Sequence, residues 1–229
     1  MDRLFQRLLI LVVIVLLSFL PALASSLPSV GDTMSFGGYT WRVLEVRDGA
    51  ALLLTDVVIE ANLYSVELTD VTWETCFLRS YLNDRFLQNF TAEERERIIE
   101  TSVSNPDNLW YGTAGGADTL DKVFLLSLEE ADRYFGDSGD YHNARRVRWG
   151  AQGIEIADDG WALSNEHDDE RTAILGYGFS WWWLRSPGSN NLSAAAVSVG
   201  GDMNVRGRDV DAMHPDMGGV RPAIWLKLE

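Results

Sequence analysis

Apolar and polar positions along the chain repeat first with the period of strands and then with that of helices. Residues 39–46 alternate in part, Asp48-Gly49 favours a tight hairpin turn, and residues 50–59 form a mostly apolar returning strand. Between residues 73 and 99 the apolar positions recur at helical spacing, which predicts two helices. Thr91 and Glu94 have the spacing of a capping box and mark the start of the second helix.

The second half of the chain predicts shorter elements around one irregular region. The pattern indicates a short buried strand over residues 121–126, and the capping-box pair Ser127 and Glu130 opens a helix that ends near Phe135. Residues 136–178 are rich in Gly, Asp and Asn and hold no long periodic segment, so we expect an irregular insertion there. A hairpin with a Gly200-Gly201 turn and a final strand are expected over residues 194–199, 202–205 and 220–228.

This order of strands, helices and strands predicts an α+β fold. Two principal helices would pack on a twisted, mainly antiparallel sheet, and the long insertion at about residues 136–178 would stand outside it. The last strand is expected to pair with an early one and bring the termini together. Because no repeat or low-complexity linker divides residues 25–229, we expect a single domain.

The first 24 residues have the pattern of a secretory signal peptide. Arg3 and Arg7 precede an apolar run over residues 8–20, and Ala22-Leu23-Ala24 supplies the small residues that a signal peptidase recognises. The run is short for a membrane span, which takes about 20 residues. We therefore expect cleavage after Ala24, a secreted or cell-surface protein, and no membrane span after cleavage. An uncleaved N-terminal anchor is the alternative.

Net charge narrows the classes of partner. The whole chain carries a formal charge of −15, and the expected signal carries +1, so the remainder carries −15 − 1 = −16. A protein this acidic repels nucleic acid and anionic membranes, which leaves an extracellular protein or carbohydrate as the expected partner. The single cysteine, Cys76, excludes an intrachain disulfide, and its place at an apolar helix start indicates a core residue rather than a nucleophile.

Two blocks near the end of the chain place an arginine among large apolar residues. Arg185 follows three tryptophans, residues 181–183, and Arg221 precedes a strand that contains Trp225. A buried guanidinium is costly unless it is paired, so both arginines are expected to be buried with fixed carboxylate or carbonyl partners. For the tryptophans we favour core packing over an exposed ring that stacks on a ligand. The residues we assign to structural roles are Trp73, Trp182, Arg185, Arg221 and Trp225.

With these blocks the sequence resembles a known bacterial family, catalogued as domain of unknown function 6273. The resemblance rests on four blocks in order, over residues 72–86, 122–131, 182–188 and 219–223, within a match of about residues 31–228. That family in turn resembles a branch of the C-type-lectin fold, because the Gly219-Val220-Arg221-Pro222 ending is similar to that of formylglycine-generating-enzyme-like proteins. The resemblance implies a two-helix, twisted-sheet domain and no particular activity.

Proteins with the implied fold are known for cysteine-dependent catalysis and calcium-dependent sugar binding, and this chain has few of the residues that either requires. Formylglycine-generating enzymes use a pair of late cysteines, whereas this chain has Cys76 alone. Asn105-Pro106-Asp107 has the composition of a turn, and the acidic run 166–170 lacks the alternating spacing of a calcium loop. His142, His167 and His214 form no metal-binding pair. We therefore expect no cofactor and no metal, with calcium as the open alternative, and single out no catalytic residue.

The densest run of hydrogen-bonding side chains between the two end blocks is the candidate ligand surface. Its members are Asn190, Asn191, Asp202, Asn204, Arg206, Arg208, Asp209 and His214. The leading hypothesis is a secreted or surface-associated, non-catalytic recognition domain for an extracellular protein or glycan. One alternative is a hydrolase-like enzyme with its site in the 136–178 insertion, and another is a structural component of the cell envelope.

Overall fold

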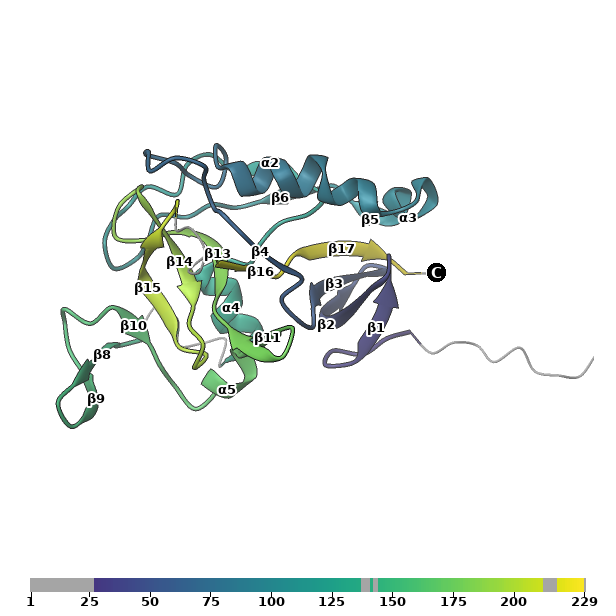
Figure 1. Ribbon diagram of the computed structural model, residues 1–229. Helices are drawn as coiled ribbons and strands as arrows, with labels where there is room; N and C mark the ends of the chain where they lie inside the picture. Colours follow the sequence, from purple (N-terminus) through teal and green to yellow (C-terminus); the bar gives the residue numbers. More distant parts are fainter. Residues whose placement is uncertain (1–26, 137–140, 142–143, 212–217, 229) are drawn as a thin grey trace, which may run out of the picture.

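A computed structural model of the chain describes residues 27–136, 141, 144–211 and 218–228. The expected signal peptide, His142 and His214 lie outside these residues. The fold is mostly β, with 39% of the described residues in strands and 16% in helices. Two larger sheets lie side by side, and the chain passes between them more than once (Figure 1).

The first sheet has five strands and is antiparallel throughout. Its order is β1 (Thr33–Phe36), β2 (Tyr39–Arg47), β3 (Ala50–Thr55), β17 (Ala223–Lys227) and β5 (Ile98–Ile99). Asp48 and Gly49 connect β2 to β3 with positive φ angles of 50° and 74°, the conformation that the hairpin turn requires. All of β3 is buried, and it pairs with the last strand, as the sequence predicts.

The second sheet has eight strands, one pair of which, β13 with β16, is parallel. Its order is β4 (Glu60–Asn62), β16 (Gly218–Val220), β13 (Trp182–Pro187), β14 (Ser193–Val197), β15 (Met203–Asp209), β10 (Ala162–Leu163), β8 (Arg146–Gly150) and β9 (Gly153–Ile156). Two further hairpin-like pairs join β6 (Thr101–Val103) to β7 (Thr119–Asp121) and β11 (Ala173–Leu175) to β12 (Gly178–Ser180).

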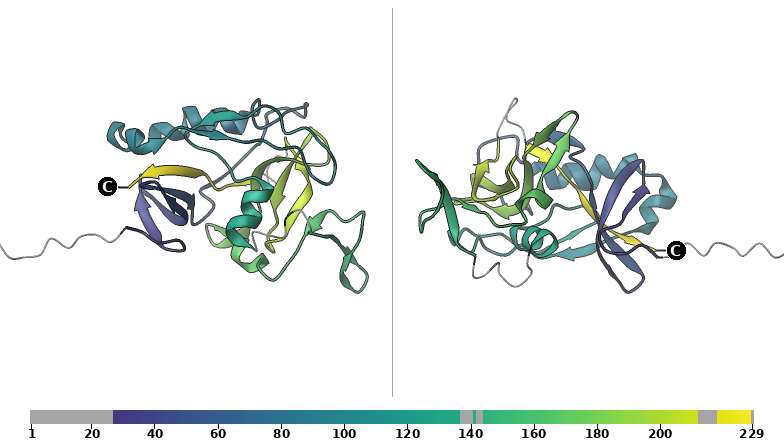
Figure 2. Two further views of the ribbon diagram at one scale, coloured as in Figure 1. Left: turned by 180° about the vertical axis from the view of Figure 1, so that it is seen from behind. Right: turned by 90° about the horizontal axis from the view of Figure 1, so that it is seen from below.

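The expected last strand is in fact two strands in different sheets. β16 ends at Val220, β17 begins at Ala223, and Arg221-Pro222 connects them. Proline has no N–H to give to a sheet, so the chain leaves one sheet here and enters the other. Figure 2 shows this yellow segment crossing between the two sheets in both additional views.

The described helices are short. They are α2 (Phe77–Asp84), the 3-10 helix η1 (Phe86–Asn89), α3 (Ala92–Arg97), α4 (Leu128–Phe135) and α5 (Asp168–Arg171). Both predicted capping boxes are present, because Thr91 and Glu94 bond reciprocally at α3 and Ser127 and Glu130 do so at α4. In Figure 1 the run from α2 to α3 lies along β17, whereas α4 lies on the other side of it.

The expected α+β class with two principal helices on a sheet is wrong. The predicted second helix stops at Arg97 and buries no residue, and Ile98–Ile99 pairs with β17 instead. From sequence alone, the short apolar pair Ile98-Ile99 is compatible with a helix or with a strand. It forms a strand because the neighbouring edge of β17 offers backbone groups to pair with.

The 136–178 insertion is also more regular than expected. It contributes β8, β9 and β10 to the eight-stranded sheet. It also contains the helix α5 and the strand β11, which pairs with β12 outside that sheet. These strands are two to five residues long, too short for a clear alternation in sequence.

Candidate functional site

Three residues of the first sequence block converge on one buried carboxylate. Asp121, which is 1% exposed, accepts hydrogen bonds from Trp73 Nε1 at 2.9 Å, from Arg79 Nε at 2.7 Å and from Asn83 Nδ2 at 3.5 Å. Asn83 Oδ1 also accepts hydrogen bonds from the backbone N–H groups of Lys122 and Val123, the two residues after Asp121, at 2.9 and 3.1 Å. These contacts attach α2 to the segment after β7. The first block therefore serves the fold.

Arg185 is buried and has the partners that the sequence predicts. Its guanidinium bonds both carboxylate oxygens of Glu130, at 2.8 Å for Nη2 with Oε1, and the carbonyls of Leu125 and Ser104. Burial alone would raise the pKa of Glu130, but the charge and hydrogen bonds of Arg185 outweigh it and hold that pKa below its usual range. This contact anchors the first turn of α4 to β13.

Arg221 is also buried, at 1% exposure, but carbonyls replace the carboxylate partner. Nε donates to the Thr55 carbonyl at 3.1 Å and Nη2 to the Asp56 carbonyl at 3.4 Å. The guanidinium carbon lies 4.8 Å from the centre of the Trp182 ring. Burial, followed by the charge of Arg42, lowers the pKa of Arg221 to about 9.

The three consecutive tryptophans form part of the core, at exposures between 0 and 8%. A Cβ on Gly218 would lie 2.1 Å from Trp183 Nε1, so glycine is required where β16 passes this ring. The interpretation of Trp181–Trp183 as core is therefore confirmed. Trp225 is 9% exposed and lies under the Arg47 guanidinium at 4.5 Å.

The structure distributes the predicted ligand-binding residues over several places. Asn190 caps its own turn by accepting from Leu192 N–H, and Asn191 donates to the Ala114 carbonyl at 3.0 Å. Asp202 accepts from the Ser198 hydroxyl, and Asn204 from Gly207 N–H. These four side chains therefore serve local turns or loop contacts.

The remaining candidates lie on β15 or outside the described residues. Arg208 covers the Trp181 ring at 4.4 Å, and Arg206 and Asp209 are exposed. The Trp161 carbonyl accepts from Arg206 N–H, and Trp161 N–H donates to the Val147 carbonyl, so Arg206 lies one strand from β8. His214 cannot be placed with them.

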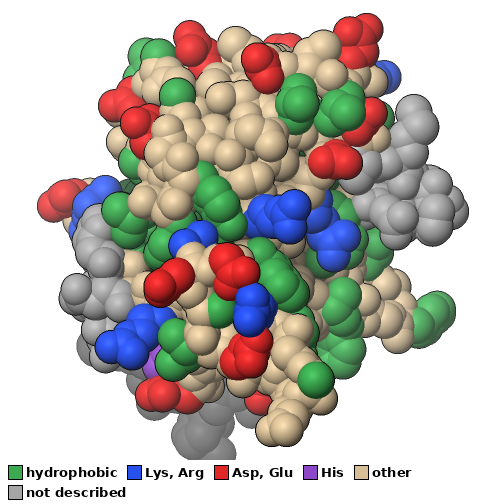
Figure 3. Space-filling model, turned by 90° about the vertical axis from the view of Figure 1, so that its left-hand side faces the viewer, with side chains coloured by type: hydrophobic (Ala, Val, Ile, Leu, Met, Phe, Trp, Pro, Cys, Tyr) green, Lys and Arg blue, Asp and Glu red, His purple; other side chains and the backbone are tan. Residues whose placement is uncertain are grey.

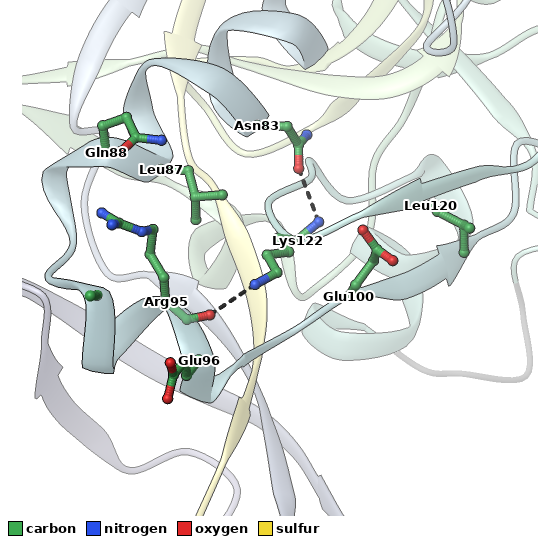
Figure 4. Close-up of a pocket in the computed structure, with 9 residues that line it drawn as sticks. Asn83, Leu87, Gln88, Arg95, Glu96, Glu100, Leu120 and Lys122 are labelled. Atoms are coloured by element: carbon green, nitrogen blue, oxygen red, sulfur yellow. Dashed lines mark hydrogen bonds between the residues drawn. The ribbon is translucent and has the colours of Figure 1, made fainter.

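A hollow of about 570 Å³ lies between the helical run and β7. Its walls carry Arg95, Lys122, Glu96 and Glu100, which balance in charge (Figure 4). Lys122 Nζ already donates to the Arg95 carbonyl at 2.9 Å, and Asn83 Oδ1 already accepts from Lys122 N–H. Its central polar groups therefore serve the attachment of α2 and α3, and nothing here selects a ligand.

Two smaller hollows adjoin each other in the insertion and share Ala144, Arg145 and Ile156. They measure about 340 and 310 Å³. The first also contacts Asp132 and Ser164, and the second Trp110, Arg146 and Asp158. We call this pair the insertion site. Figure 3 shows basic side chains gathered across the middle of the face on which the insertion lies.

The arginines of this region differ in their partners. Arg148 bonds Glu155 at 2.7 Å and Asp159 at 2.8 Å. Within the described residues, Arg145 and Arg146 form no ion pair, and Arg146 lies 5.4 Å from the centre of the Tyr111 ring. Two guanidinium groups without an ion pair among the described residues thus line the insertion site, together with the side chains of Asp132 and Asp158.

An exposed apolar strip extends from the insertion site along the β8–β9 hairpin. Trp149 pairs with Ile154 and Val147 with Ile156, so these side chains lie on one face of the hairpin. Trp149, Ile154 and Ile156 are 61, 49 and 65% exposed. An exposed apolar strip beside unpaired charges is typical of an interaction surface.

Sequence reasoning named the insertion only as the place of an alternative enzymatic site and missed these residues, although a signal was present. Arg145, Arg146 and Arg148 fall within four residues of an otherwise acidic chain, followed by the aromatic Trp149. The acidic run 166–170 was considered as a calcium loop, but in the structure Asp168 within it makes contacts to nearby residues. Asp168 bonds Ser164 at 2.6 Å and Arg171 at 2.5 Å, and among the described residues no group of His, Cys, Asp or Glu could hold a metal ion.

Within the described part of the chain, no helix is long and apolar enough to cross a membrane. No curated protein and no solved structure matches this chain. A family model described as a domain of unknown function, DUF6273, matches residues 48–228. This match covers most of the chain and includes all four sequence blocks. The chain therefore belongs to the DUF6273 family.

Proposed function

We propose that the protein is a secreted or surface-associated, non-catalytic recognition domain. Its ligand is an extracellular protein or glycan that carries carboxylate groups. The observation that supports this proposal is the insertion site, where Arg145 and Arg146 have no ion pair with any described residue while Arg148 nearby has two. Guanidinium groups bind carboxylates through paired, directional hydrogen bonds.

The apolar strip supplies the second half of the interaction. Ile156 lines the hollow with the arginines, and the exposed Trp149 continues the same face of the hairpin. Exposed tryptophan is typical of binding surfaces for proteins and for sugars. The rest of the chain is strongly acidic and repels long polyanions. The ligand therefore carries only a few carboxylates, which are grouped where they meet the insertion site.

The test is a binding array that pairs each carboxylated glycan and peptide with its neutral counterpart. The full chain is expressed with its own N-terminal segment and recovered from the medium. We expect binding to carboxylated members, and an affinity loss of about tenfold or more for the double variant Arg145→Ala, Arg146→Ala.

Arg148→Ala is the matched control, because this arginine is already occupied by Glu155 and Asp159. It should keep most of the affinity. Equal binding by the double variant would remove the insertion site from the proposal. Chemical conversion of any array member would contradict a non-catalytic role and favour the hydrolase-like alternative.

A further inference from the structure

The junction between the two sheets contains two buried polar groups without partners. Nη1 of Arg221 and the hydroxyl of Thr55 form no hydrogen bond within the described structure, and the two residues are 1% and 0% exposed. The two residues that carry these groups are neighbours, because Arg221 Nε donates to the Thr55 carbonyl at 3.1 Å. A buried donor without an acceptor costs about 1–3 kcal/mol, so such groups call for a physical explanation.

The charge at this junction is not balanced. Among the described residues Arg221 has no carboxylate within ion-pair distance, and the nearest charges are those of Arg42 and Asp56, which bond each other at 3.5 Å. Two guanidinium groups therefore face one carboxylate. A buried cation without a counter-charge is among the costliest features of a protein interior.

Aromatic rings offset part of this cost. The Arg221 guanidinium carbon lies 4.8 Å from the Trp182 ring centre and 5.7 Å from that of Phe135, and Arg42 lies 5.7 Å from the same Phe135 ring. Ring faces attract a cation, but they supply neither a negative charge nor an acceptor oxygen for Nη1.

We propose that Arg221 Nη1 and the Thr55 hydroxyl form a buried binding site for a small monovalent anion of halide size. Both groups are donors that an anion accepts from, and the surplus positive charge favours an anion over a neutral water molecule. Because both residues are almost fully buried, we expect a small anion in this site. The site is independent of the insertion site and joins the two sheets through one bound ion.

Thermal unfolding of the purified protein in sodium chloride, sodium bromide and sodium gluconate at equal ionic strength tests the proposal. Screening of the acidic surface is the same in all three salts, whereas gluconate is too large for the site. Because a ligand that binds only the folded state stabilises it, we expect a saturable rise of about 3 °C in chloride or bromide over gluconate. Equal melting temperatures in the three salts would overturn the proposal and leave a water molecule as the partner of Nη1.

Thr55→Val removes the hydroxyl at nearly constant volume and should abolish the halide-specific rise. Thr40→Val, the same change at an exposed position of β2, should leave it intact. A Thr55→Val protein that keeps the full rise would contradict the site, whatever its overall stability. Bromide soaked into crystals should give an anomalous scattering peak beside Arg221, and a peak elsewhere alone would count against it.

Discussion

At the scale of single residues, buried polar contacts explain the sequence blocks. Glu130 shows the principle, because it closes the capping box of α4 and also pairs with Arg185 of β13. One carboxylate therefore fixes both the start of a helix and its place on the sheet. Charges that are buried and fully paired in this way specify one arrangement of the two elements.

Removing this carboxylate tests the contact. Glu130→Gln should lower the free energy of unfolding by about 3 kcal/mol, because Arg185 would remain buried without its counter-charge. Glu129→Gln changes a neighbouring, more exposed carboxylate, 3.7 Å from Arg133, and should cost less than about 1 kcal/mol. Urea unfolding of the three proteins gives both values, and similar losses in the two variants would contradict the assigned role.

The same pair predicts a dependence on pH. The pKa of Glu130 is lower in the folded than in the unfolded protein, so its stabilisation is present above the unfolded pKa and is lost as pH falls through the folded one. The stability difference between wild type and Glu130→Gln should therefore be full at pH 6 and shrink below about pH 4. Melting temperatures across this range measure it, and a constant difference would argue against the pairing.

Cys76 makes a separate prediction. Its thiol is buried, caps α2 by accepting from Arg79 N–H, and has a pKa raised to about 12 by burial. Because the thiolate is the reactive form, iodoacetamide should not modify the folded protein at pH 8, and modification should follow unfolding in guanidinium chloride. Mass spectrometry detects the adduct, and rapid labelling of the folded protein would show an accessible, reactive cysteine.

At the scale of elements, side chains on short helices hold them against the sheets. α3 buries no residue, whereas α2 buries Leu78 and Leu82 and η1 buries Phe86 and Leu87. Asn83 adds polar contacts to this apolar attachment, accepting from the N–H groups of residues 122 and 123 and donating to the Arg79 and Val123 carbonyls.

Asn83→Ala should therefore cost about 2 kcal/mol and release the segment after β7. The Lys122 and Val123 amides should exchange hydrogen faster in the variant, whereas the β2–β3 ladder should keep its protection. Asp84→Ala, at the exposed neighbouring position, is the control and should change neither. Uniformly faster exchange would indicate a global loss of stability instead of a local attachment.

At the scale of the whole molecule, the last of several connections between the two sheets lies near the end of the chain. Arg221-Pro222 passes the chain from β16 to β17, and the block that precedes it, Gly218-Gly219, packs against Trp183 and the Trp181 carbonyl. The two end blocks of the sequence therefore meet in space. The insertion extends the eight-stranded sheet away from this junction and carries the exposed hairpin β8–β9 (Figure 1).

Secretion is a prediction at this scale. If residues 1–24 act as a signal peptide, the protein recovered from the medium or cell surface should begin at Ser25. Intact-mass measurement of the expressed full chain decides this. A mass that retains the first 24 residues, found in the membrane fraction, would instead support the uncleaved anchor.

The sequence alone determined mainly those features whose cause is local. The hairpin at Asp48-Gly49, both capping boxes, the buried tryptophans at 181–183 and the burial of Arg185 and Arg221 followed from turn chemistry, spacing and the cost of burying charge. The pairing of the last strand with an early one was expected on the general ground that the termini of a single domain lie close together. Tertiary structure decided those features that depend on contacts between segments far apart in the sequence. An open edge beside β17 made Ile98–Ile99 a strand, adjacent strands ordered the insertion, and carbonyls and rings rather than a carboxylate surround Arg221. Likewise, only the fold showed that Arg145 and Arg146 lack ion partners within the described residues while Arg148 has two, because ion pairing depends on distances that no sequence pattern contains.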